Sequence, residues 1–165
     1  MRKLMVMMLT ITFGNVYAQS ENLLNIPSKT TTRIPVEEGP NVWGVFHGRV
    51  PCQEMAKELK MPVESSCEKL KWAFTFYQDP ATRQLTAYKW EGSLFRNKPA
   101  EGKCVLLKGM PDNPDAVLVQ LNPDKPEHSV FLLKGDDNVL FMLDSNKNLI
   151  KGTDYLSYTF NRVVN

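Results

Sequence analysis

The sequence predicts an all-β protein, an antiparallel meander of about eight strands that closes into a small β-barrel. Short apolar runs alternate with turn-forming residues from residue 42 onward, and strands at such close spacing are typical of a meander. In the run at 69–78, large apolar side chains recur at every second position and form one face: Leu70, Trp72, Phe74 and Phe76. A meander of this length loses its exposed edges when it closes on itself, which favours a barrel.

Turn chemistry sets the boundaries of the predicted strands. The first hairpin turn falls at 79–83, where Pro80 supplies a fixed φ angle, and the later turns are rich in Gly, Asn and Asp. The predicted strands are 42–50, 69–78, 85–96, 102–108, 116–121, 128–134, 138–144 and 155–162.

Residues 51–68 depart from the strand pattern. Met55, Ala56 and Leu59 recur at helical spacing, and Pro51 suits the first turn of a helix. We therefore expect a short helical excursion after the first strand, lying across an open end of the barrel.

The first eighteen residues have the features of a secretory signal peptide. Arg2 and Lys3 form a positive start, and the apolar run at 4–13 is too short to span a bilayer as a helix. Small or tolerated residues at 16–18 predict cleavage before Gln19. No cysteine follows the apolar run, so the chain has no lipobox. We expect a periplasmic or secreted protein that keeps no transmembrane segment after the signal is removed.

The mature chain divides into a lead-in and one domain. Residues 19–41 are polar, contain three prolines and show no sustained period, which predicts an extended or disordered segment. Residues 42–163 form the predicted barrel domain. Of the 20 Lys and Arg residues, two lie in the leader, which leaves 18 basic residues against 18 Asp and Glu. This balanced net charge gives no electrostatic footprint for nucleic acid or for anionic lipid.

Three cysteines follow the leader, and an exported protein is expected to bridge one pair. Cys52 and Cys67 are the preferred pair because they lie at the two ends of the excursion, and closing such a loop is worth ~3 kcal/mol. The pairings Cys67–Cys104 and Cys52–Cys104 stay open. In the preferred pairing, Cys104 is a free thiol that packs as a small apolar residue in a strand.

Catalytic motifs are missing from the sequence. There are two histidines, His47 and His128, no Gly-x-Ser-x-Gly elbow, no Gly-rich phosphate loop and no zinc-finger spacing. The candidate acidic pairs, Asp136-Asp137 and Asp112-Asn113, lie in turns, where Asp side chains are expected to hydrogen-bond to the backbone. We therefore expect no enzymatic activity.

Soft-metal binding is the one chemical function with support in the residues themselves. Cys52, Met55 and Cys67 gather in the excursion, and thiolate and thioether sulfurs are ligands that suit Cu(I). The simpler interpretation carries more weight: the methionine fills the core and the cysteines bridge. Copper is thus the only cofactor that the sequence suggests.

The predicted strands also carry a large aromatic content: Trp43, Trp72, Trp90, Phe74, Phe76, Phe131 and Phe141. An eight-stranded barrel is just wide enough to be filled by such side chains or to hold one small ligand. The filled interior is favoured, and a small apolar ligand is the alternative.

Three stretches resemble the NlpE-like family of copper-resistance proteins. The run 44–52 (GVFHGRVPC) resembles the opening of the family's N-terminal domain, in which a Gly-x-aromatic-x-Gly-x-x-Pro-Cys run precedes a barrel hairpin. Two others resemble its exported branch: 69–72 (KLKW) leading to 77–80 (YQDP), and 133–141 (LKGDDNVLF) leading to 158–162 (YTFNR). The resemblance spans about 42–162, nearly the whole mature domain.

The resemblance implies a small lipocalin-like β-barrel in the bacterial envelope, associated with copper tolerance or envelope-stress signalling. Two departures matter. The family's lipidated N-terminal cysteine is absent, and in its Cys-x-x-Cys motif Cys52 matches the first position whereas Met55 stands at the second. Cys67 is the candidate for that second role.

The function expected from the sequence is therefore that of an exported, non-catalytic, NlpE-like barrel in copper or envelope-stress homeostasis, with an envelope protein as partner. A lipocalin-like carrier of a small apolar ligand is the alternative. A structural or interaction module is the third.

Overall fold

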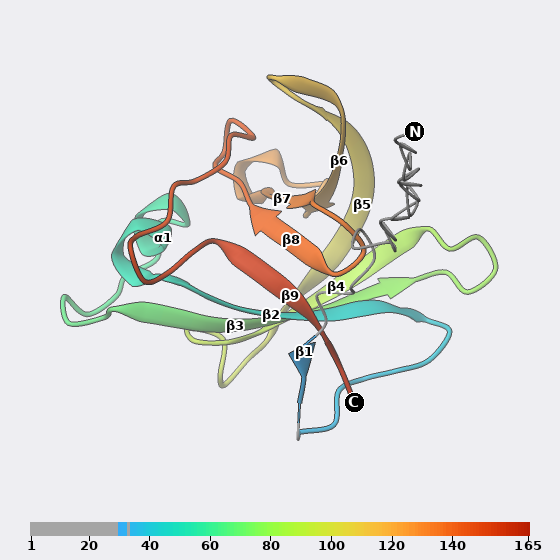
Figure 1. Ribbon diagram of the computed structural model, residues 1–165, viewed down its shortest axis with the longest axis horizontal. Coiled ribbons are helices and arrows are strands. Elements are labelled where there is room, and N and C mark those ends of the chain that lie inside the picture. The colour runs from blue at the N-terminus through green and yellow to red at the C-terminus, as the bar shows by residue number, and fades with distance from the viewer. Residues whose placement is uncertain (1–29, 33) are drawn as a thin grey trace, which may run out of the picture.

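Eight antiparallel strands close into a barrel in the computed structural model, which describes residues 30–32 and 34–165 (Figure 1). Each strand pairs with the next along the chain, and the last strand pairs back onto the first, so the sheet has no open seam between them. The predicted fold class is thus confirmed. The predicted signal peptide at 1–18 lies outside the described residues.

The barrel strands are β2 (Val42–Pro51), β3 (Lys69–Gln78), β4 (Leu85–Gly92), β5 (Ala100–Met110), β6 (Asn113–Leu121), β7 (Val130–Lys134), β8 (Val139–Met142) and β9 (Thr159–Val164). A short helix, α1 (Cys52–Glu58), follows β2 as expected, and one 3-10 turn, η2 (Pro126–His128), precedes β7. A two-residue strand, β1 (Thr30–Thr31), adds to β9 in parallel.

Two predicted strands extended four residues beyond the observed ones. The strand predicted at 85–96 ends at Gly92, whose φ of 110° turns the chain, and the Phe95 amide then donates to the Gly92 carbonyl. The strand predicted at 155–162 begins only at Thr159, because the Thr153 hydroxyl accepts the amides that follow it and forms a turn. Phe95 and Tyr158 give these segments part of a strand pattern because they pack on the core from a loop.

The middle of the barrel is filled by side chains. The apolar face of β3 points inward and is at most 2% exposed, as its alternation predicts. Phenylalanines from three strands meet there with no exposure at all: Phe46, Phe74, Phe76 and Phe160. Their rings pack edge-on or offset at centroid distances of 5.0–5.9 Å.

Arg162 closes one end of the barrel where the first and last strands meet. Its Nη1 donates to the Trp43 carbonyl at 2.8 Å and its Nε donates to the Asp137 carbonyl at 2.6 Å. The guanidinium lies over the rings of Trp43 and Phe46, at 5.3 and 4.7 Å from their centroids. Gly44 has no side chain where the guanidinium passes, which permits this close approach.

The described part of the lead-in is extended and lies on the outer face of β9, β2 and β3. Tyr77 donates to Glu37 at 2.8 Å, and Gln78 donates to the carbonyl of Pro40 at 2.9 Å. Burial, followed by the neighbouring Glu37 carboxylate, raises the pKa of Tyr77 and keeps its hydroxyl a donor. Strand β1 continues this packing through its parallel pairing with β9, which no side-chain pattern in the sequence predicts.

The connections differ strongly between the two ends of the barrel. The long ones, 52–68, 93–99, 122–129 and 143–158, all lie at one end, because alternate connections of an antiparallel meander share an end. The short turns 79–84, 111–112 and 135–138 lie at the other, with Arg162. The part of the chain that the structure describes contains no helix long and apolar enough to cross a membrane.

Candidate functional site

A cavity of about 1130 Å³ opens at the end of the barrel that carries the long connections. Its floor consists of side chains that belong to the buried core, each at most 4% exposed: Met55, Tyr88, Trp90 and Met142. Apolar walls rise from the floor at Leu59, Met61, Phe95, Ala100, Val130 and Phe131. The rim is polar and carries both charges: Glu54, Lys57, Glu58, Lys60, Asn122, Glu127, His128, Asp144 and Ser145.

Helix α1 forms one wall of this cavity and is held at several points. Its first residue, Cys52, is bridged to Cys67, with the two Cα atoms 5.7 Å apart. Gln53 donates from Nε2 to the carbonyls of Glu64 and Cys67, both at 2.9 Å, and so crosses the same loop. At the other end of the helix, Glu58 accepts the backbone amide of Ser145 at 2.9 Å. The helix is therefore tied to the rest of its own connection, 52–68, and to the connection 143–158.

A polar pair lies beside the apolar floor. The Tyr88 hydroxyl donates to Asn122 Oδ1 at 3.1 Å, and Asn122 Nδ2 donates to the His128 carbonyl at 3.2 Å. A Cβ atom on Gly102 would meet both Asn122 and the Tyr88 ring, so glycine is required for this packing. Burial raises the pKa of Tyr88, which keeps the phenol neutral and able to donate.

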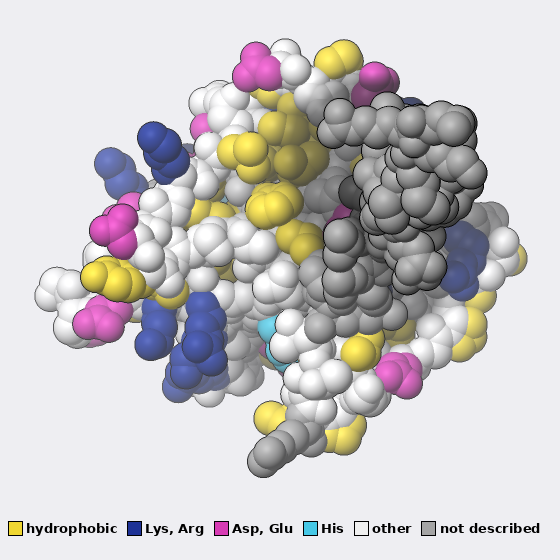
Figure 2. Space-filling view, viewed as in Figure 1, with side chains coloured by type: hydrophobic (Ala, Val, Ile, Leu, Met, Phe, Trp, Pro, Cys, Tyr) yellow, Lys and Arg dark blue, Asp and Glu magenta, His cyan; other side chains and the backbone are white. Residues whose placement is uncertain are grey.

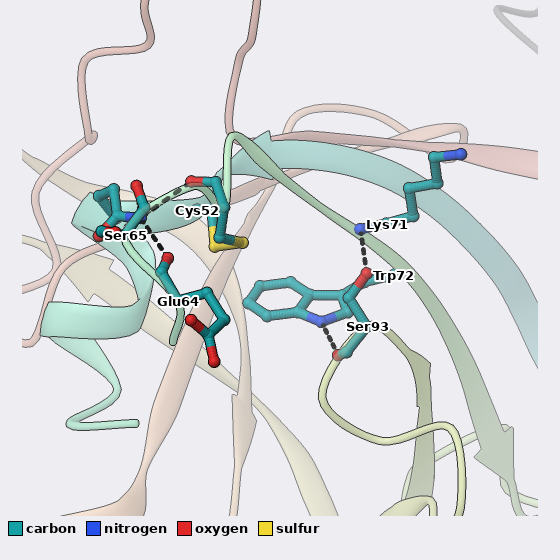
Figure 3. The surroundings of a disulfide bond; sticks show 8 residues. Cys52, Glu64, Ser65, Lys71, Trp72 and Ser93 are labelled. Atoms are coloured by element: carbon teal, nitrogen blue, oxygen red, sulfur yellow. Dashed lines mark hydrogen bonds between the residues drawn. A yellow bond between two sulfur atoms is a disulfide. The ribbon is translucent and has the colours of Figure 1, made fainter. Parts of the chain in front are cut away.

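Two tryptophans, one of which lies at the cavity floor, pack against each other and differ in their hydrogen bonds. The Trp72 indole N–H donates to the Ser93 carbonyl at 2.7 Å (Figure 3), whereas the buried Trp90 Nε1 has no hydrogen-bond partner among the described residues. The two rings meet edge to face with centroids 4.6 Å apart, and Phe95 packs on Trp90 at 4.8 Å. Of the two indoles, only that of Trp90 lines the cavity.

The predicted metal ligands are brought together, but as a disulfide. Cys52 and Cys67 are bridged, so the preferred pairing is confirmed and the two pairings with Cys104 are wrong. Met55 is 1% exposed and contributes to the cavity floor. Within the described residues, no three His, Cys, Asp or Glu side chains group as metal ligands would. Because thiolates are the ligands, the bridge must be reduced before these sulfurs can bind a metal.

Cys104 is a free, fully buried cysteine, and burial raises the pKa of its thiol to about 12. Leu106 shares its face of β5 yet is 45% exposed. The reason is that β4 pairs with β5 only as far as Lys103, and the β5–β6 hairpin then projects beyond the barrel (Figure 1). Cys104 is thus the last residue of its face that the core covers.

The two histidines lie on different surfaces. His128 stands at the cavity rim with Nε2 3.8 Å from Glu127. His47 points outward from β2, and partial burial lowers its pKa. Trp90 was among the predicted strand aromatics, whereas Tyr88 and Asn122 were not predicted as site residues. Tyr88 lies two residues before Trp90 on the same face of β4, and this alternation could have identified it. Asn122 follows the end of β6, and no local sequence pattern identifies it as a site residue.

Comparison with protein-family models, with curated proteins and with solved structures found no match to this chain.

Proposed function

We propose that this protein is an exported, non-catalytic β-barrel that binds one small amphipathic ligand in the end cavity. The observation that carries the proposal is the cavity itself, about 1130 Å³ with an apolar floor and a polar rim. Pockets for small molecules are typically ~300–1,000 Å³, mostly apolar, with a few polar groups that orient the ligand. Here the cavity lies at the end where long connections can shape it.

The lining suits a ligand with an apolar body and a polar end. Met55 and Met142 are adaptable side chains that can repack around different shapes, and the Trp90 ring offers a flat apolar surface. Tyr88 and Asn122 already bond to each other and can exchange that bond for one to the ligand. Lysines and carboxylates at the rim keep the polar end near water.

A non-catalytic role is supported by the hydrogen bonds of Ser129, whose hydroxyl-bearing side chain lines the end cavity. Ser129 Oγ donates to the Asn122 carbonyl at 3.1 Å and accepts from Gln120 at 3.0 Å. This serine therefore stabilises the connection before β7. Nucleophilic catalysis would require a serine paired with a base.

Export is supported by the disulfide. Bridges between Cys residues persist in oxidising compartments and are rare in the cytosol, and Cys52–Cys67 closes the excursion that shapes the cavity. The resemblance to the NlpE-like family adds the bacterial envelope as the compartment and an envelope protein as partner.

The first test fills the cavity. Ala100 lies opposite Trp90 in the β4–β5 register and lines the cavity, so Ala100→Phe should place a phenyl ring where the ligand binds. Binding of N-phenyl-1-naphthylamine, a neutral apolar fluorophore, should weaken by about tenfold or more, which corresponds to a loss of about 1.4 kcal/mol or more in binding free energy, because the new ring occupies space that the fluorophore needs. The measurement is a fluorescence titration of the purified protein.

The matched control is Ala87→Phe, which makes the same change on β4 at a position that does not line the cavity. It should bind the fluorophore like the unchanged protein, and circular dichroism should show that both variants fold. Equal binding by Ala100→Phe and the unchanged protein would place the fluorophore elsewhere and contradict the proposal.

Copper binding is a second candidate, supported by one observation. The disulfide brings the sulfurs of Cys52 and Cys67 to the same point, and Met55 follows one turn along α1. We expect no Cu(I) binding by the oxidised protein and binding of one Cu(I) after reduction, since two thiolates then become available. Competition with a chromogenic Cu(I) chelator measures both states.

Two variants make this copper test specific. Cys67→Ser should abolish binding by the reduced protein, whereas Cys104→Ala should leave it unchanged because the Cys104 thiol is buried and protonated. Cu(I) binding that survives Cys67→Ser would contradict this candidate.

A further inference from the structure

A second hollow, of about 830 Å³, lies on the outer face of the barrel over β9, β2 and β3. Three basic side chains line it: His47 and Arg49 from β2 and Lys71 from β3. We call it the cationic groove. In Figure 2, Lys and Arg side chains gather over β3 below α1, close to a histidine. The groove and the end cavity share no lining residue.

The basic residues of the groove are placed against each other rather than against acids. Arg49 stands directly opposite Lys71 in the antiparallel register, and like charges at opposite positions destabilise a sheet. Among the described residues, neither side chain makes an ion pair or a hydrogen bond, and His47 makes none either. Three lysines elsewhere on the surface are paired with carboxylates at 2.6–3.0 Å: Lys89, Lys103 and Lys134.

The surroundings of the three bases supply further donors. Hydroxyl and amide groups line the same groove: Thr30, Thr31, Thr32, Ser157, Thr159 and Asn161. Ala73 lies opposite His47 and fills little of the space between the basic side chains. The described part of the lead-in, through β1, bounds one side, and the connection before β9 bounds the other.

We propose that the cationic groove binds a phosphate group. Arg49 can donate two parallel hydrogen bonds to phosphate oxygens, Lys71 adds a mobile ammonium, and His47 and the hydroxyls complete the donor set. A bound phosphate replaces the repulsion between Arg49 and Lys71 with two attractions. The groove is much larger than one phosphate ion, so the group belongs to a larger molecule, either a lipid headgroup or a soluble phosphorylated compound.

The test begins with inorganic phosphate and uses the two histidines as reporters. In NMR spectra recorded at constant pH, phosphate should shift the ring signals of His47 with saturation and leave those of His128 in place, because His128 lies at the other site. Arg49→Gln combined with Lys71→Gln should weaken this binding by roughly tenfold or more, since two charge-assisted contacts are lost. Lys57→Gln combined with Lys60→Gln removes the same charge from the rim of the end cavity and should leave phosphate binding at the cationic groove unchanged.

Sedimentation with vesicles then separates the two sources of phosphate. Binding to phosphatidylglycerol vesicles but not to phosphatidylcholine vesicles, lost in the Arg49 and Lys71 double variant, identifies a lipid headgroup. Phosphate binding without vesicle binding identifies a soluble phosphorylated compound. Unshifted His47 signals, or a double variant that binds phosphate as well as the unchanged protein, would overturn the proposal. Fluorophore binding in the end cavity is measured separately and does not depend on either result.

Discussion

Replacing Cys52 by serine is expected to lower the free energy of unfolding by about 2–4 kcal/mol. The bridge to Cys67 closes the loop that contains α1, and without it the unfolded chain gains conformational entropy. Cys52 is also fully buried, so the serine hydroxyl would enter an apolar core. Urea denaturation under non-reducing conditions, followed by tryptophan fluorescence, measures the loss.

Cys104→Ala is the matched control, because it removes a buried sulfur without a bridge. It should cost about 1 kcal/mol, similar to the removal of one buried methylene. The Gln53 bonds to the 64–67 segment remain in the Cys52→Ser variant, so the barrel should still fold. A Cys52→Ser variant as stable as the unchanged protein would mean that these bonds alone hold the excursion.

Replacing Arg162 by alanine is expected to cost about 3 kcal/mol. The substitution leaves the partly buried Trp43 carbonyl, which Arg162 reaches at 2.8 Å, without that donor, and an unsatisfied acceptor costs up to about 1–3 kcal/mol when buried. It also removes the cation from the faces of Trp43 and Phe46, an interaction worth about 0.5–2 kcal/mol. The same urea titration measures the effect.

Arg162→Lys separates charge from geometry. Lysine keeps a cation near Trp43 but cannot donate in two directions from a planar group, so its loss of stability should lie between those of alanine and the unchanged protein. Equal stability of all three proteins would show that the pairing of β9 with β2 and β8 closes the barrel without this side chain.

The two candidate functions of the excursion are physically linked. Met55 belongs to the cavity floor and is also the thioether nearest in sequence to Cys52. Coordination of Cu(I) by Met55 would draw its side chain from the floor and alter the cavity. Reduced protein titrated with copper should then bind the apolar fluorophore less well if the candidate metal site includes Met55.

The order and type of most elements followed from the sequence because local patterns encode them. Alternation along β3 identified the inward face, and turn residues such as Pro80 marked the hairpins. The helical spacing of Met55, Ala56 and Leu59 predicted the helix of the excursion, and the positions of Cys52 and Cys67 at its two ends predicted the disulfide between them. These signals are local because each depends on residues a few positions apart.

Tertiary structure alone decided where the sites lie. The cavity is the space left where four long connections meet. The fold also places Tyr88 within hydrogen-bond distance of Asn122 beside this cavity, although the two residues are distant in sequence. The cationic groove depends on the register that sets Arg49 opposite Lys71, and a slip of one residue would separate them. Empty space and cross-strand register are set by how the whole chain closes, so no periodicity within one segment contains them.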